Sequence, residues 1–476
     1  MRCPTPAAFC LLLTAVLSHA PPLGAAQPNI LFILADDLGW KDLGCYGSPF
    51  NETPHIDKLA GQGLRFTQAY TAGAVCSPTR GSIMSGKFPV RTGVTDYIPG
   101  LPSTGRKLVT KPTNKQLALE EVTVAEALRE GGYQTFYAGK WHLGNRGFEP
   151  QDQGFEGVVS DKQLGNDNKD WKSGQRLSES AVKFLHERDA TRPFFMFLGY
   201  HEPHTPILEY PEHIAHFKEK AAGQITAAVH SRQERDGQTR LIQKDPAYAS
   251  EVAGLDSFVG SVLGELDKSG LADNTVVIFF SDNGGLSTKA DVGPTSNEPL
   301  RAGKGWLYEG GIRVPLIVRA PGRTKAGSTT DAPVISTDIY PTLLALAGLP
   351  ARPQQHRDGL DVSAVLRGDA APARDTLFWH YPHYHGSTWA PGGAMREGDW
   401  KLIEFFDEGT AELYNLKADL SERENLAAAE PERLKSMQAK LAAWRAETGA
   451  HMPVPGETPA AEKPKAKKKR NQKATK

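Results

Sequence analysis

The stretch Cys76-Ser77-Pro78-Thr79-Arg80 places a thiol and a guanidinium within one short loop. Other reactive groups follow separate apolar runs of the chain: Asp36-Asp37, then Gly139-Lys140-Trp141-His142, then Asp282-Asn283-Gly284. Open α/β sheets bind ligands at the carboxyl ends of their strands. If these apolar runs are strands of one sheet, we expect the thiol, cations, carboxylates and imidazole to form one composite site.

The carboxylates indicate a metal. Asp36, Asp37, Asp282 and Asn283 offer only oxygen ligands. An all-oxygen set suits Ca²⁺, with Mg²⁺ the less favoured ion, and does not suit Zn²⁺. Taken singly, Asp-Asp is equally a helix N-cap and Asp-Asn-Gly a turn. Their shared position after apolar runs favours the metal site.

The cysteines leave two interpretations open. Cys3 and Cys10 lie in an N-terminal segment that resembles a signal peptide, so a mature chain keeps Cys45 and Cys76. In an oxidising compartment these two residues can form one disulfide. If Cys76 is chemically modified instead, the disulfide cannot form and Cys45 is a lone thiol.

Two long motifs carry a family resemblance. The first runs on from Arg80 as Gly81-Ser82-Ile83-Met84-Ser85-Gly86, and the second is Gly132-Tyr133-Gln134-Thr135-Phe136-Tyr137-Ala138-Gly139-Lys140-Trp141-His142. Both resemble the signatures of the type I sulfatases, which belong to the alkaline-phosphatase-like superfamily. The arylsulfatases and N-acetylgalactosamine-sulfate sulfatases are most similar in appearance. Ser85 departs mildly from the family pattern, and the resemblance spans residues 29 to 426.

The resemblance implies a mechanism. A maturation enzyme would oxidise Cys76 to formylglycine, whose hydrate attacks sulfur and later releases sulfate by re-forming the aldehyde. Residue 76 would also ligate the cation. Arg80, expected in the first turn of a helix, would hold the formylglycine. Asp282 would accept the proton of the attacking hydroxyl.

The remaining catalytic roles are also implied by the resemblance. Lys140 and His142 alternate along an extended segment and can point to one side. Lys140 would bind sulfate oxygens, and His142 would assist the elimination of sulfate. His204 and Lys304 would serve the leaving oxygen. A serine that supports the sulfate site in relatives has Ser160 as a candidate, but the spacing after Gly154-Phe155 is shorter here and the assignment stays open.

Substrate contacts are expected from two later segments. Asn297 and Arg301 precede Lys304, while His383 and His385 lie in a run rich in aromatic and imidazole groups. Aromatic faces stack on sugars, which favours a carbohydrate sulfate, with galactose or N-acetylgalactosamine sulfate as the specific expectation. The alternative for this run is ordinary packing with a second metal site on its histidines.

Two other functions fit parts of the pattern. One is a phosphonate monoester or phosphodiester hydrolase, because the same superfamily carries the same Cys-Pro-Arg signature. The other is a catalytically dead protein that binds sulfated glycans. The intact set of candidate metal and catalytic residues argues against the second.

Apolar patterning predicts the fold class. Continuous apolar runs at 29–35, 133–138, 194–200, 275–280 and 314–318 are typical of strands buried on both faces. Helical patterns at 122–129 and 248–266 alternate with them. We expect a three-layer α/β/α domain with a mixed, mostly parallel sheet. Antiparallel strands at 375–381, 393–406 and 411–416 and a helix at 430–447 predict a smaller C-terminal α+β subdomain.

Composition completes the prediction of domains and location. We expect a signal peptide at 1–26, a catalytic domain at 27–373, the subdomain at 374–452 and a disordered basic tail at 453–476. Without the last 14 residues the chain has 47 basic and 55 acidic residues, which disfavours nucleic-acid binding. We expect no membrane span and export to the periplasm or exterior, or to the lysosome in a eukaryote.

Overall fold

The computed structural model describes residues 27–165, 170–223 and 230–456. The predicted signal peptide and the basic end of the chain, from residue 457, lie outside these ranges. A nine-stranded sheet forms the centre, in the order β12-β2-β11-β9-β1-β6-β4-β5, with β13 beside β2. Its strands are β1 (Asn29–Ala35), β2 (Leu64–Tyr70), β4 (Gln134–Gly139), β5 (Gly157–Ser160), β6 (Phe194–Gly199), β9 (Thr275–Ser281), β11 (Arg313–Arg319), β12 (Ser328–Thr330) and β13 (Val334–Ile335).

The sheet is mixed and mostly parallel, as predicted. Strand β1 lies between β6 and β9 and runs parallel to both, and β4 is parallel to β5 and β6. Strand β11 is antiparallel to both β9 and β2. The carboxyl ends of β1, β4, β6 and β9 therefore meet at one edge of the sheet.

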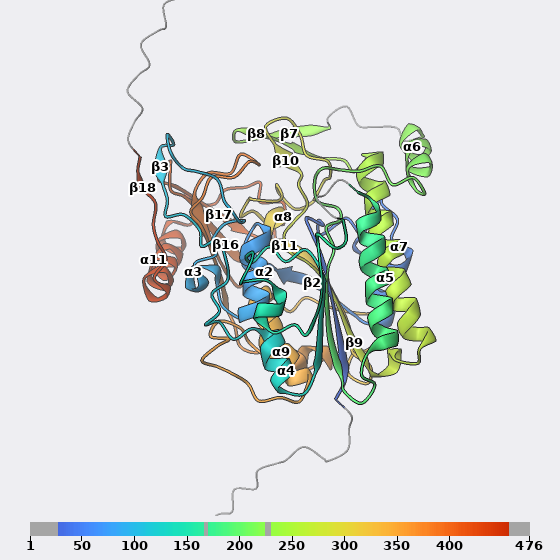
Figure 1. Cartoon of the computed structure of the whole chain (residues 1–476). Coiled ribbons are helices and arrows are strands. Elements are labelled where there is room, and N and C mark those ends of the chain that lie inside the picture. The colour runs from blue at the N-terminus through green and yellow to red at the C-terminus, as the bar shows by residue number, and fades with distance from the viewer. Residues whose placement is uncertain (1–26, 166–169, 224–229, 457–476) are drawn as a thin grey trace, which may run out of the picture.

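Helices cover both faces, which explains the continuous apolar runs. On one face Ile30, Phe32 and Leu34 pack in a core shared with α2 (Cys76–Ser85), α4 (Val124–Glu130) and α9 (Ile339–Leu346). On the other, Leu31 and Ile33 pack with α1 (Pro54–Gln62), α5 (Lys172–Glu187) and α7 (Pro246–Lys268). Figure 1 shows the two helical layers on opposite sides of the sheet. A strand buried on both faces cannot alternate apolar and polar residues.

The C-terminal subdomain is an antiparallel sheet with a helix, as predicted, but one strand boundary was wrong. The segment 393–406 was expected as one strand and forms two, β15 (Gly392–Glu397) and β16 (Trp400–Phe405). A two-residue turn separates them, in which Gly398 has φ +55°. The sheet also contains β14 (Thr376–Tyr381) and β17 (Thr410–Asn415), with α11 (Pro431–Thr448) packed against it.

Short elements complete the described chain. Strands β7 (Ser231–Glu234), β8 (Gly237–Arg240) and β10 (Thr288–Lys289) form a small sheet near the top of Figure 1. The remaining helices are α3 (Pro89–Thr92), α6 (Ile214–Ala222), α8 (Glu309–Ile312) and α10 (Ser363–Leu366), with 3-10 turns at Gly44–Tyr46, Pro150–Gln153, Ala272–Asn274 and Ser336–Asp338. Among the described residues, no helix is long and apolar enough to cross a bilayer.

The start of the predicted disordered tail was also wrong. Strand β18 (Val454–Pro455) pairs in antiparallel fashion with β3 (Leu108–Val109). The prediction relied on the loss of apolar periodicity after residue 453. A short backbone ladder on an exposed edge needs no buried face, so periodicity could not reveal it.

A buried ion-pair cluster joins the two parts of the molecule. Lys401 on β16 is fully buried and lies 2.9 Å from the Glu309 carboxylate of α8 and 2.8 Å from that of Glu422. Burial and Glu309 together raise the pKa of Glu422 to about 7, although Lys401 opposes the shift. Burial opposes ionisation of Glu309 as well, but Lys401 and Arg313 lower its pKa to about 2. The contact fixes the subdomain against the segment that follows Lys304.

Candidate active site

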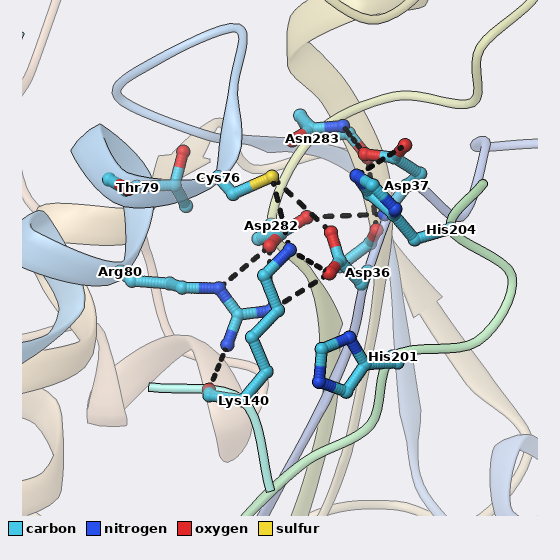
Figure 2. Close-up of polar contacts among 12 residues, drawn as sticks. Asp36, Asp37, Cys76, Thr79, Arg80, Lys140, His201, His204, Asp282 and Asn283 are labelled. Carbon is cyan, nitrogen blue, oxygen red and sulfur yellow. Dashed lines mark hydrogen bonds and ion pairs between the residues drawn. The ribbon is translucent and has the colours of Figure 1, made fainter. Parts of the chain in front are cut away.

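The predicted metal ligands, together with Arg80, Lys140 and His204, converge at the carboxyl edge of the sheet (Figure 2). Asp36 and Asp37 directly follow β1, Lys140 follows β4, and Asp282 follows β9. Cys76 begins helix α2 and faces them. We call the following set the floor: Asp36, Asp37, Cys76, Arg80, Lys140, Asp282 and Asn283. Each floor residue is less than a tenth exposed.

Charged contacts hold the floor together. Arg80 donates from Nε to Asp282 Oδ2 over 2.9 Å and from Nη1 to the Lys140 carbonyl over 2.6 Å. Lys140 donates from Nζ to Asp36, and the same ammonium lies 3.6 Å from Cys76 Sγ. The Cys76 sulfur is also 3.3 Å from Asp36 Oδ1. Residue 76 therefore lies between a cation and a carboxylate.

Arg80 is not a surface residue. Helix α2 begins at Cys76, so Arg80 lies in the second turn rather than the predicted first turn. Its side chain is 2% exposed, and its Nη2 lies 2.8 Å from Asp282 Oδ2. Burial opposes its charge, yet Asp282 and Asp36 raise the pKa of Arg80 further. It stays cationic and fixes the Asp282 carboxylate.

The floor fits a hard cation. Oxygens of Asp36 and Asp37, the Cys76 sulfur and a His204 nitrogen lie within 4.8 Å of one another. Asn283 donates from Nδ2 to Asp37 Oδ1 over 2.8 Å, while its buried Oδ1 has no hydrogen-bond partner among the described residues. A buried amide oxygen without a donor is costly unless a ligand satisfies it. An oxygen-rich set with one such atom suits Ca²⁺ or Mg²⁺.

The neighbouring charges shift the pKa values of Asp36 and Asp282 in opposite directions. Burial favours the neutral form of Asp36, but Lys140 and His204 hold its pKa well below its ordinary value. Burial and the neighbouring Asp36 charge raise the pKa of Asp282 to about 7, against the pull of Arg80. Such crowding of like charges is what a bound cation relieves.

Cys76 and Cys45 form no disulfide. Both are free thiols, Cys76 buried and Cys45 half-buried. Cys45 lies instead beside Asp57, whose carboxylate accepts a hydrogen bond from the Cys45 backbone N–H over 2.7 Å. Burial and Asp36 raise the pKa of the Cys76 thiol above its ordinary value, although Lys140 opposes the shift. An unmodified Cys76 is therefore a neutral thiol rather than a reactive thiolate.

His142 reaches the cavity by a turn and not by strand alternation. Gly139 ends β4 with φ +101°, and a Cβ there would lie 2.1 Å from the Gly199 carbonyl oxygen. His142 itself has φ +57°, so the expected extended segment is wrong, although Lys140 and His142 line one cavity. His142 Nε2 lies 2.6 Å from the Ile98 carbonyl oxygen and must carry the proton, which leaves Nδ1 as the basic atom.

The histidines are neutral and the lysines charged. Burial and Lys140 lower the pKa of His142 to about 3. Burial and Lys304 lower the pKa of His204 to about 4. Burial opposes the charge of Lys304, but Asp37, 2.7 Å away, raises its pKa. At neutral pH the proton donor beside Asp37 is therefore Lys304.

One cavity of about 510 Å³ opens above the floor. Its lining includes the following residues, which the sequence predicted as catalytic: Cys76, Lys140, His142, His204 and Lys304. We call its outer residues the rim: Tyr97, Leu286, Lys289, His385, Gly386 and Ser387. Gly305 allows His385 of the rim to lie close to the backbone that follows Lys304, because a Cβ at residue 305 would lie 2.2 Å from His385 Nδ1.

Several lining residues were not found from the sequence. His201, Tyr97 and Lys289 all line the cavity. His201 Nε2 lies 3.1 Å from an Asp161 carboxylate oxygen. His201 stands three residues before His204, a proximity that could have suggested it. Tyr97 and Lys289 lie in loops and short strands without a signature.

Three predicted substrate residues do not line the cavity. Asn297 is buried and donates to the Gly285 and Ala302 carbonyls, so it joins two loops. Arg301 pairs with Glu234 at 2.6 Å. His383 bonds to Thr95 Oγ1 over 2.9 Å. These polar groups are used inside the protein, which a sequence pattern does not show.

Ser160 is likewise outside the cavity. Both its backbone N–H and its hydroxyl donate to Gln163 Oε1, over 2.9 and 3.0 Å. His385, in contrast, lines the cavity as predicted. Its Nδ1 accepts from the Ser387 backbone N–H over 3.1 Å, which leaves the proton on Nε2 as a donor.

The chain matches the sulfatase family model over residues 28–349 and a model described as N-sulphoglucosamine sulphohydrolase, C-terminal, over residues 302–447. It is 35% identical to human arylsulfatase A, over 85% of this chain and 79% of that protein. It is 30% identical to N-acetylgalactosamine-6-sulfatase of the dog, over 79% and 73% of the two chains.

Solved structures agree. The crystal structure of Ps i-CgsB in complex with k-i-k-neocarrahexaose superposes with a TM-score of 0.70 at 29% identity, covering 88% of this chain and 92% of that one. The chain therefore belongs to the sulfatase family, with the alkaline-phosphatase-like fold. It is a sulfuric ester hydrolase.

Proposed function

We propose that this protein removes sulfate from a sulfated carbohydrate, with residue 76 acting as a formylglycine. The observation that carries the proposal is the position of Cys76. Its side chain lies at the bottom of the cavity, 3.6 Å from the Lys140 ammonium and 3.3 Å from the Asp36 carboxylate. A neutral, buried thiol there has no evident catalytic use.

The modified residue would supply a hydrated aldehyde, one hydroxyl of which attacks sulfur while the other later releases sulfate. Ca²⁺, in preference to Mg²⁺, would be held by Asp36, Asp37, Asp282, Asn283 and residue 76, and would neutralise charge on the sulfate. Asp282 would take the proton of the attacking hydroxyl. Arg80 orients that carboxylate through two of its nitrogens.

The other lining groups divide the remaining work. Lys140 binds sulfate oxygens beside residue 76. Lys304 donates a proton to the departing alcohol, and His204, 3.7 Å from Asp37, assists at the same oxygen. His142 accepts a proton at Nδ1 during release of sulfate, because its Nε2 proton is held by the Ile98 carbonyl.

The substrate class follows from the size of the cavity and from its rim. About 510 Å³ is more space than one sulfate group needs. His385 offers an Nε2 donor there, and its ring meets that of Tyr97 edge to face at 5.8 Å. Galactose or N-acetylgalactosamine sulfate is our specific proposal, supported by the likeness to N-acetylgalactosamine-6-sulfatase. The N-terminal segment supports export to the periplasm, exterior or lysosome.

Two measurements test the proposal. Mass spectrometry of the peptide that contains residue 76, from protein made in its native host, should show aldehyde in place of thiol. Cys76→Ala should abolish hydrolysis of 4-nitrophenyl sulfate while calcium binding, measured by calorimetry, persists. Substantial sulfate release by this variant would contradict the assignment. Faster hydrolysis of an aryl phosphodiester than of the aryl sulfate would favour the phosphodiesterase alternative.

A further inference from the structure

Lys289 brings a cation to the rim from outside the floor. It lies on β10, whose register is fixed by pairing with β8 and by a 2.7 Å hydrogen bond between the buried Thr288 and Thr239 hydroxyls. Seven residues earlier the same segment supplies Asp282 to the floor. Lys289 thus lies a short distance along the chain from the floor, at the end of a strand whose pairing fixes its position.

Its ammonium is weakly engaged by the protein. Within the described part of the chain its one ion pair is with Asp291, at 3.8 Å, and Asp291 is 80% exposed. The Lys289 side chain is 42% exposed and lines the cavity. An exposed pair at this distance contributes little, so the ammonium is available to a ligand.

The cavity wall carries an excess of positive charge. Three lysines and, among the residues that the structure describes, no carboxylate line it: Lys140, Lys289 and Lys304. Beneath the wall, the three acidic floor residues balance Arg80, Lys140 and Lys304. A divalent cation adds two charges and one sulfate ester removes one. Lys289 therefore increases a positive charge that a single sulfate already leaves unbalanced.

We propose that Lys289 binds a second anionic group of the substrate, a sulfate or carboxylate on the sugar beside the scissile sulfate. This inference rests on the proposed function and narrows its substrate to dianionic glycans. The cavity is large enough for a second sugar. Lys289 does not reach the reacting atoms in this assignment and determines specificity only.

The test compares inhibitors of 4-nitrophenyl sulfate hydrolysis. The three probes are derivatives of one galactose disaccharide. The first carries one sulfate, the second two sulfates, and the third one sulfate and one carboxylate. The protein without a substitution, carrying formylglycine at residue 76, should bind a dianionic probe about fivefold more tightly than the monosulfated one, the upper range for a solvent-accessible ion pair. The dianionic probe that binds more tightly shows whether the second anionic group is a sulfate or a carboxylate.

Lys289→Gln should remove that preference, and Lys289→Arg should keep it. Lys58→Gln is the matched control, because Lys58 forms a similar exposed pair with Asp267 at 3.9 Å on α1, away from the lining. Raising the salt concentration should also weaken the preference. Equal inhibition by all three probes, or a preference that survives in Lys289→Gln, would overturn the role of Lys289. Absence of aryl sulfate hydrolysis by protein with a confirmed formylglycine and no substitution would instead overturn the proposed function.

Discussion

The floor and the rim of the cavity are built in different ways. Floor residues follow strands of one sheet or lie on the helix packed on it, and Arg80 contacts both Asp282 and the Lys140 carbonyl. The rim is assembled from three distant segments, and His385 belongs to the C-terminal subdomain. The difference suggests that chemistry is fixed by the sheet, while specificity depends on how the subdomain meets it.

The largest effect should come from the floor. Arg80→Lys keeps the charge but cannot contact Asp282 through two nitrogens and the Lys140 carbonyl through a third. We expect kcat for 4-nitrophenyl sulfate to fall about 100- to 1,000-fold, as for other pre-positioned charge-stabilising groups. Steady-state kinetics on protein with a confirmed formylglycine measures this.

Arg91→Lys is the control for that substitution. Arg91 contacts Asp358 at 2.9 Å from α3, outside the cavity lining. Its replacement should change kcat less than twofold. If the two variants behave alike, the floor geometry does not control the chemistry, and the contrast between floor and rim fails.

Much of the floor could be predicted because its residues occupy local motifs next to strands. Asp36-Asp37 and Asp282-Asn283 directly follow β1 and β9, and both strands are apolar runs recognisable in the sequence. His142 was found from its motif, but its approach through φ +57° was not. Gly139 is needed because the Gly199 carbonyl approaches it closely, and that tertiary contact is not visible in the sequence.

The rim was predicted poorly for a physical reason. Polar residues near Lys304 look alike in sequence whether they face a ligand or the protein. Asn297 and Arg301 are held by Gly285 and Glu234, partners that only the folded chain brings close. Lys289 has no motif, and its position depends on pairing of β10 with β8.

The next largest effect, on stability, should come from the buried ion-pair cluster around Lys401, which we call the joint between the catalytic domain and the C-terminal subdomain. Lys401→Met leaves the carboxylates of Glu309 and Glu422 buried without their shared cation. Removing one partner of a buried ion pair costs about 3 to 5 kcal/mol of stability. We expect a lower thermal midpoint, measured by calorimetry, and greater protease cleavage between the subdomains.

A compensated variant separates charge from packing at this joint. Combining Lys401→Met with Glu422→Gln removes the carboxylate left without a cation, while Glu309 keeps Arg313 at 3.3 Å, so part of the lost stability should return. If the double variant is no more stable than Lys401→Met, the side-chain packing of Lys401 matters more than its charge. The ion pairs of the joint would then not be what holds the C-terminal subdomain, and with it His385 of the rim, in place.

The smallest effect should come from the rim itself. His385→Ala removes the Nε2 donor and the edge contact with Tyr97, but it leaves every floor contact in place. We expect kcat/KM for a sulfated disaccharide to fall about tenfold, equal to about 1.4 kcal/mol, mainly through KM. His383→Ala is the matched control, because His383 stands two residues earlier but bonds to Thr95 outside the cavity lining. Its loss should lower stability and leave KM unchanged.

A fall in kcat for His385→Ala as large as that for Arg80→Lys would show that the C-terminal subdomain takes part in the chemistry. The separation of floor from rim would then be wrong.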